Sequence, residues 1–226
     1  MVKRVPRWES ELWSYVSSGD GEHCSLYSYC PGRQQGGWCM GDYMERVKRL
    51  TDYGGFNPAS CDFVACGTGC RMAQMVAMLA QGYVERAGVR HPPVPTELIS
   101  LVDDHHIIEI RPLPLKAYHG AIWRLKDRWI IQVKENDSPA TQRFAIFHEA
   151  FHILAHCKTS PVFRKRGVVQ GSFNELLADA FAANVLAPAE WVRQKWAEVR
   201  DLDRMAGIFN VPKSVMCIRL KYLGLT

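Results

Sequence analysis

The stretch QRFAIFHEAFHILAH occupies residues 142–156 and decides how the rest of the chain is interpreted. Two of its histidines, His148 and His152, are four residues apart, and Glu149 follows the first of them directly. Residues four apart lie on one face of an α-helix, one turn from each other, so both imidazoles can bind a single zinc ion. Glu149 lies close enough to accept a proton from a zinc-bound water without being a ligand. The stretch therefore predicts a helix that carries a hydrolytic zinc site.

The residues around this stretch indicate a helix that is packed in a core. Asp137 or Ser138 is a suitable N-cap, and Pro139 stands in the first turn, where proline is tolerated. Four apolar residues share the adjacent face and would anchor the helix: Phe144, Phe147, Phe151 and Leu154. The alternative is a surface helix with two unrelated histidines.

A zinc site of this kind needs a third protein ligand and an open position. The metzincin spacing would put a histidine at position 158, where Lys158 stands, so that subclass is excluded. Glu175 on the next predicted helix completes a His-His-Glu site, and Asp179, one turn further, can accept the outer N–H of a ligand histidine. The alternative for Glu175 is a capping box with Ser172, which would make it a residue of the helix terminus and not a ligand.

Two runs of sequence together resemble the ImmA/IrrE family of zinc metallopeptidases, and the likeness covers about residues 92–190. The first run is residues 142–156, and the second begins at Glu175, continues through Asp179 and ends at Pro188. The resemblance implies a gluzincin-like zinc endopeptidase in which Glu149 is the catalytic base. It also implies a catalytic Zn²⁺ held by three ligands: His148, His152 and Glu175.

Members of the resembled family are typically bacterial or phage-borne and cleave a DNA-binding repressor, which releases the genes of a mobile element or of a DNA-damage or other stress response. The resemblance therefore implies a helix-turn-helix repressor as the protein partner. The chain departs from the family pattern at Phe151, where a small residue is usual, and at Ala187, where methionine is common. The alternative comes from another class: a non-proteolytic metal-binding regulator that binds a protein partner or DNA through the same scaffold.

The organisation of the chain predicts an α+β fold with a mainly helical, zincin-like core and a small antiparallel sheet. Consecutive prolines near residue 92 indicate a linker, so we expect a module at 1–90, the peptidase core at 91–190 and a helical unit at 191–226. Residues after Ser138 have a helical pattern almost throughout, and three runs indicate strands: Ile107–Ile110, Gly120–Leu125 and Trp129–Val133. Tyr118 and His119, just before the second strand, are candidate donors to the reaction's oxyanion, with ordinary loop residues as the alternative.

Eight cysteines are present, and six of them crowd the first third of the chain: Cys24, Cys30, Cys39, Cys61, Cys66 and Cys70. In a reducing compartment, clustered cysteines hold metal more often than they form disulfides. Their spacings do not match a paired C-x-x-C zinc ribbon. Three interpretations stay open: a second, structural Zn²⁺, an iron–sulfur cluster that senses redox state, and free cysteines.

The segment 205–225 has the outline of a helix-turn-helix whose second helix carries Lys213, Arg219 and Lys221. The net charge of the whole chain is only +5, so nucleic acid is a weakly supported partner, and a packing or docking hairpin is favoured. Hydrophobic residues make up 47% and charged residues 23%, which excludes a disordered chain. No stretch approaches the roughly 20 apolar residues that cross a bilayer, and no apolar signal core opens the chain, so we expect a cytoplasmic protein and no membrane partner.

Overall fold

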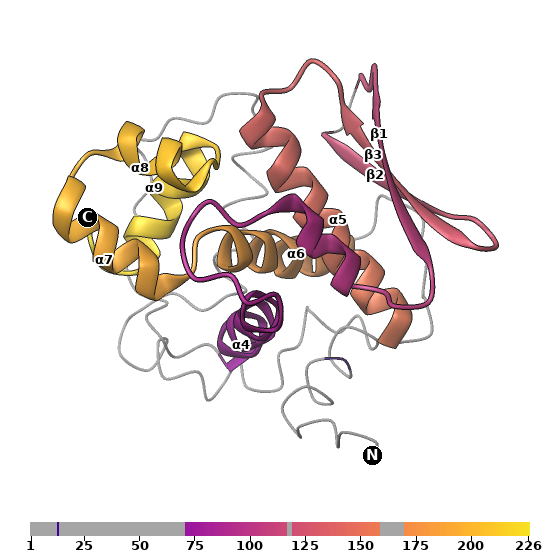
Figure 1. Cartoon of the computed structure of the whole chain (residues 1–226), viewed down its shortest axis with the longest axis horizontal. Coiled ribbons are helices and arrows are strands. Elements are labelled where there is room, and N and C mark those ends of the chain that lie inside the picture. The colour runs from indigo at the N-terminus through magenta and orange to yellow at the C-terminus, as the bar shows by residue number, and fades with distance from the viewer. Residues whose placement is uncertain (1–12, 14–70, 117–118, 159–169) are drawn as a thin grey trace.

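Two long helices, α5 (Pro139–Lys158) and α6 (Gln170–Leu186), pack against each other at the centre of the fold (Figure 1). The structure is a computed structural model that describes Trp13 and residues 71–116, 119–158 and 170–226. Helix α5 contains the whole of the predicted metal-binding stretch, and α6 contains the predicted third ligand. The two helices therefore bring the two sequence runs together.

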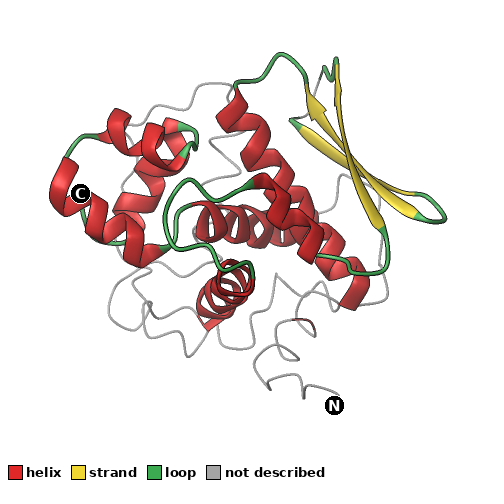
Figure 2. Ribbon diagram, in the orientation of Figure 1, coloured by secondary structure: helices red, strands yellow, loops and turns green. Residues whose placement is uncertain are grey.

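A three-stranded sheet lies beside α5 (Figure 2). Its strands are β1 (Ile107–Leu113), β2 (Gly120–Arg124) and β3 (Arg128–Lys134), in the spatial order β1-β3-β2. The β2–β3 hairpin is antiparallel, but β1 pairs with β3 in parallel, so the expectation of an antiparallel sheet is wrong for one of its two pairings. The α+β class itself is confirmed for the described part of the chain, which combines helices with this small sheet.

The central place of β3 has a plain physical reason, because it is the most apolar strand. Trp129, Ile131 and Val133 point into the core beneath the sheet, and Ile130 is only 6% exposed on the opposite face. A strand that is covered on both faces is most stable between two neighbours. Inserting β3 between β1 and β2 satisfies this requirement and leaves β2 at an edge of the described sheet.

Helix α4 (Arg71–Arg86) packs against α6 and belongs to the same core as α5. Four aromatic rings form a continuous row through this core. Trp13 lies 5.9 Å from Phe151, Phe151 lies 5.7 Å from Phe181, and Phe181 lies 5.8 Å from Tyr83, measured between ring centroids. The row explains why a large residue is accepted at position 151, since the fully buried Phe151 ring fills the space between Trp13 and Phe181.

A short 3₁₀ helix, η3 (Thr96–Leu101), lies between α4 and the sheet and contacts α5. The proline-rich segment before it is held to the core, because Val94 is fully buried and its carbonyl accepts a hydrogen bond of 2.7 Å from Arg143 Nη2. Residues on both sides of position 90, from α4 and from Val94 onward, therefore belong to the same core. The proposed division of the chain at residue 90 stays a prediction.

Three shorter helices form the C-terminal part of the fold, at the opposite end from the sheet (Figure 1). They are α7 (Ala189–Val199), α8 (Leu202–Phe209) and α9 (Lys213–Tyr222). Asn210 adopts a left-handed conformation and ends α8, which produces the sharp turn that the sequence predicts between the last two helices. In the described residues, no helix has both the length and the apolar character that a membrane crossing requires.

Candidate metal centre

Local contacts fix the start of α5 and therefore the direction of its side chains. The Ser138 hydroxyl oxygen accepts a hydrogen bond of 3.2 Å from the Thr141 N–H, so Ser138 is the N-cap. Gln142 Nε2 donates to the carbonyls of Lys134 and Glu135, which ties the first turn of α5 to the end of β3. With Phe147 and Phe151 fully buried on one side, the neighbouring face presents the two histidines toward α6.

Helix α6 begins at Gln170, so Ser172 lies inside the helix and is not its N-cap. A capping box needs its serine at the N-cap position, and the alternative interpretation of Glu175 therefore does not fit this helix. Ala178 and Ala182 are fully buried, and their small side chains allow α6 to approach α5 closely. Glu175 and Asp179, four residues apart, both reach His148 on α5.

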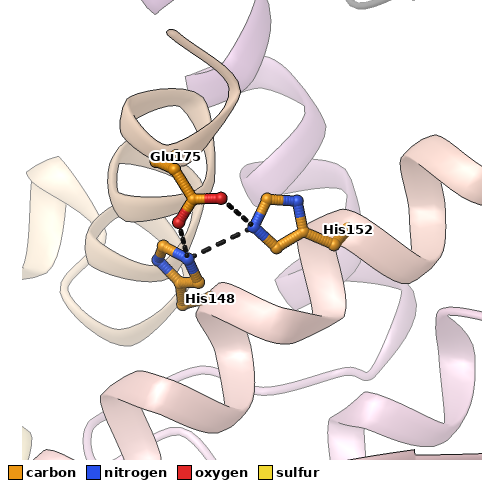
Figure 3. Close-up of side chains that lie close together, drawn as sticks. All are labelled: His148, His152 and Glu175. Carbon is orange, nitrogen blue, oxygen red and sulfur yellow. Dashed lines mark hydrogen bonds and ion pairs between the residues drawn. The ribbon is translucent and has the colours of Figure 1, made fainter. Parts of the chain in front are cut away.

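Three side chains converge between the two helices (Figure 3). His148 Nε2 lies 3.2 Å from His152 Nε2 and 3.1 Å from a carboxylate oxygen of Glu175. His152 Nε2 lies 3.3 Å from the other oxygen of the same carboxylate. Ligands at about 2.0–2.1 Å from a tetrahedral zinc ion lie roughly 3.4 Å from one another, so these separations fit one ion.

The hydrogen bonds of the cluster also indicate that it binds a cation. His148 Nδ1 is 2.7 Å from Asp179 Oδ1, and a carboxylate can only accept, so the imidazole proton lies on Nδ1. In a neutral ring, Nε2 then carries a lone pair that faces both the Glu175 carboxylate and His152. A cation at the meeting point of these acceptors satisfies them together, and Asp179 fixes the ring tautomer as the partners of zinc-bound histidines do.

In the chain without metal, a proton takes the place of that cation. Burial lowers the pKa of His148, but hydrogen bonds to Asp179 and Glu175 outweigh it and raise the pKa to about 10. Burial raises the pKa of Glu175, while hydrogen bonds to His148 and His152 outweigh it and hold the pKa far below its ordinary value. Both shifts express the same property, which is that this position stabilises positive charge.

Glu149 is 8% exposed and lies where α5 meets the first residue of β2. A Cβ atom added to Gly120 would lie 2.9 Å from Glu149 Oε1 and 3.4 Å from the Cβ of Ala145. The strand can approach the Glu149 carboxylate this closely only because residue 120 has no side chain. From the sequence, Gly120 is predicted only as the start of a strand, although a glycine in a strand often marks a close approach of another group.

Of the remaining predicted site residues, the structure describes only His119, which is not part of this cluster. The His119 ring is largely exposed, and its Nδ1 lies 2.6 Å from Asp137 Oδ2, so Asp137 orients the ring just before β2. Tyr118 lies outside the described residues, as do six residues of the predicted second metal site: Cys24, Cys30, Cys39, Cys61, Cys66 and Cys70. Cys217 is a free, half-buried thiol.

Two basic residues of α9 form contacts within the protein, one of them buried and the other at the surface. Arg219, one of the three basic residues noted on the second helix, is 4% exposed and donates hydrogen bonds to the Ala187 carbonyl at 2.9 Å and to Asn184 Oδ1 at 2.8 Å. Burial lowers its pKa to about 10. Lys213 forms an ion pair with Asp203 at 2.7 Å. Arg219 and Lys213 are thus both engaged with groups of the chain itself, which weighs against a DNA-reading surface.

Residues 103–221, more than half of the chain, match the family model Peptidase_M78, described as the IrrE N-terminal-like domain. The chain belongs to this family. Membership in Peptidase_M78 confirms the resemblance drawn from the two sequence runs, and it implies a metal as cofactor and a protein as the kind of substrate. No curated protein matches the chain at a significant level. The Peptidase_M78 match covers α5 to α8, most of α9 and the three strands, so the metal cluster lies within it.

Proposed function

We propose that this member of the Peptidase_M78 family is a zinc-dependent endopeptidase. The observation that carries the proposal is the convergence of His148, His152 and Glu175 within 3.3 Å of one another, beside the buried carboxylate of Glu149. Two imidazoles and one carboxylate form a ligand set of catalytic zinc sites, which leave one position open for water or substrate. A purely structural zinc site would have four protein ligands, and the described residues offer this group of three.

His148, His152 and Glu175 would hold a zinc ion, which would lower the pKa of a bound water toward 7 and polarise the carbonyl of the peptide bond. The chain's own residues supply the remaining steps. Glu149 accepts the proton of the attacking water and delivers it to the leaving amine. Asp179 keeps the His148 ring in one orientation and one tautomer. His119, oriented by Asp137, and Tyr118 remain proposed donors to the oxyanion.

The proposed substrate is a DNA-binding repressor of a mobile element or of a stress response, and the proposed location is the cytoplasm, where such repressors act. Family membership supports a protein substrate, and the repressor is carried over from the resemblance. We propose that the unit formed by α8 and α9 docks the protein target and not DNA, because Arg219 is buried and Lys213 is paired with Asp203.

The test compares the wild-type chain with Glu149→Gln, loaded with one zinc ion per chain. Each is mixed with purified helix-turn-helix repressors encoded beside the gene, with and without a chelator, and the products are identified by mass spectrometry. We expect wild-type protein to cut one of them in a chelator-sensitive manner and Glu149→Gln to bind zinc without cutting. Cleavage by Glu149→Gln at the wild-type rate would show that this carboxylate is not the base. Binding of a repressor without cleavage by either chain would favour the regulatory alternative.

A further inference from the structure

Strand β2 presents peptide groups at an edge of the sheet beside the candidate active site. The His119 carbonyl accepts from the Lys134 N–H, and the Leu125 N–H donates to the Arg128 carbonyl. In an antiparallel pair, alternate residues turn their N–H and C=O toward the partner strand, and the residues between them turn theirs away. The N–H and C=O of Gly120 and Ile122 therefore point to the edge opposite β3, where no described strand is paired.

That edge begins at the candidate active site. Gly120 is the residue whose absent side chain makes room for Glu149 Oε1. An extended peptide that paired with Gly120 would thus pass directly beside the carboxylate proposed as general base. Exposed strand edges bind extended peptides by adding them to the sheet, with backbone hydrogen bonds for affinity and side-chain contacts for specificity.

The outer face of the sheet, turned away from α5, offers such a side-chain contact next to this edge. Trp123 on β2 is 58% exposed, although most tryptophans are largely buried. Its ring is held in place, because its Nε1 donates a hydrogen bond of 3.1 Å to Gln132 Oε1. Its partner across the strands, Ile130, is on the same face and supplies an apolar neighbour. Leu125, 48% exposed, directly follows β2 and adds a second exposed apolar residue near this edge.

The charged groups on this face are occupied with one another. Glu109 binds Arg111 at 2.7 Å and lies 3.6 Å from Arg128. The guanidinium of Arg128 also pairs with Asp127 at 2.9 Å. A face on which the charges are mutually neutralised and an oriented tryptophan is exposed favours an apolar partner side chain over a charged one.

We propose that Trp123 forms a specificity subsite for a large apolar or aromatic side chain of a substrate segment that pairs with β2 as a fourth strand. The proposal rests on the proposed peptidase function and adds how the target is selected. Trp123 is three residues from Gly120, which is about 10 Å along a strand. The selected side chain would therefore lie about two to four residues from the bond that is cut, on the outer face of the sheet.

The probe is a library of peptides from a digested bacterial proteome, and binding is measured separately from cleavage. Zinc-loaded Glu149→Gln chain is immobilised, the retained peptides are sequenced, and the experiment is repeated with Trp123→Ala and with Trp123→Phe in the same background. We expect retained peptides to be enriched in aromatic and large aliphatic residues at one position. Trp123→Ala should weaken their binding about tenfold and abolish the enrichment, while Trp123→Phe should keep it.

The matched control is Ile107→Thr, a change at a residue 63% exposed on the same face but on the opposite edge strand, β1. A strand added to β2 would lie three strand spacings from β1, about 14 Å, so this change should leave the enrichment unaltered. Three results would each overturn the subsite. They are an unchanged peptide profile in Trp123→Ala, an effect of Ile107→Thr equal to that of Trp123→Ala, and retention of no peptide by the Glu149→Gln chain. Cleavage of the library by zinc-loaded chain carrying Glu149 reports on the proposed function alone, because peptides can be retained whether or not they are cut.

Discussion

Replacing Gly120 by alanine tests the closest contact between the sheet and the candidate active site. The new Cβ would lie 2.9 Å from Glu149 Oε1 and 3.2 Å from Glu149 Cγ, whereas ordinary contacts begin at 3.4 Å. Either the carboxylate or the strand must therefore move by about 0.5 Å. A misplacement of 1 Å in an active site can cost about 100-fold in rate, so we expect kcat/KM to fall about 10- to 100-fold, mainly through kcat.

The assay follows cleavage of the target by the zinc-loaded variant, together with zinc content and thermal unfolding. Gly207→Ala is the matched control, because no atom lies within 4 Å of the added Cβ in α8. Alanine in place of glycine inside a helix adds about 0.5–1 kcal/mol of stability, so this control should unfold at a slightly higher temperature and cut normally. Wild-type kcat in Gly120→Ala, with zinc still bound, would refute the placement of Glu149 against β2.

Three further predictions concern the metal cluster and its support. Asp179→Asn should weaken zinc binding about 10- to 100-fold without unfolding the chain, as measured by competition with a chromogenic chelator. In metal-free protein, the pKa of His148 is raised to about 10, so protonated His148 stabilises the folded chain. This stabilisation is complete below pH ~6.5 and is lost as the pH rises through about 10, so the melting temperature should fall across that range. A melting temperature that does not change with pH would contradict the ion pairs of His148 with Asp179 and Glu175. Arg219→Ala leaves buried oxygens without donors and should cost about 2–4 kcal/mol in denaturant unfolding, whereas Lys213→Gln, at an exposed pair, should have little effect; equal effects would mean that Arg219 is not the anchor.

The candidate site is predictable from the sequence to the extent that it depends on local spacing. His148, Glu149 and His152 lie on one helix, where four-residue spacing alone fixes their relative directions. The Ser138 cap and the β2–β3 hairpin are equally local, and both occur as expected. Glu175 is on a different helix, and the sequence favours it because the two-histidine motif needs a third ligand, with a capping box as the alternative.

Long-range contacts are the part that the sequence does not reveal. The parallel pairing of β1 depends on β3 entering between two strands, and nothing in the segment 107–113 specifies that neighbour. Arg219 shares the buried face of α9 with Met216 and Leu220, but the oxygens that accept its hydrogen bonds come from α6 and from Ala187, which follows α6, and the sequence of α9 does not reveal them. Gly120 is a similar case, because its importance comes from a carboxylate 29 positions further along the chain.

The row of aromatic rings has a consequence for any shortened form of the chain. Trp13 packs on Phe151 of α5, and Tyr83 of α4 packs on Phe181 of α6. Trp13 and Tyr83 both precede residue 103, where the family match begins, yet both contact the two helices that carry the three candidate ligands. A chain that begins at residue 103 would therefore lose two of the four rings, and a chain that begins at residue 71 would lose Trp13. A shortened chain that keeps the whole row has to retain Trp13 as well as α4.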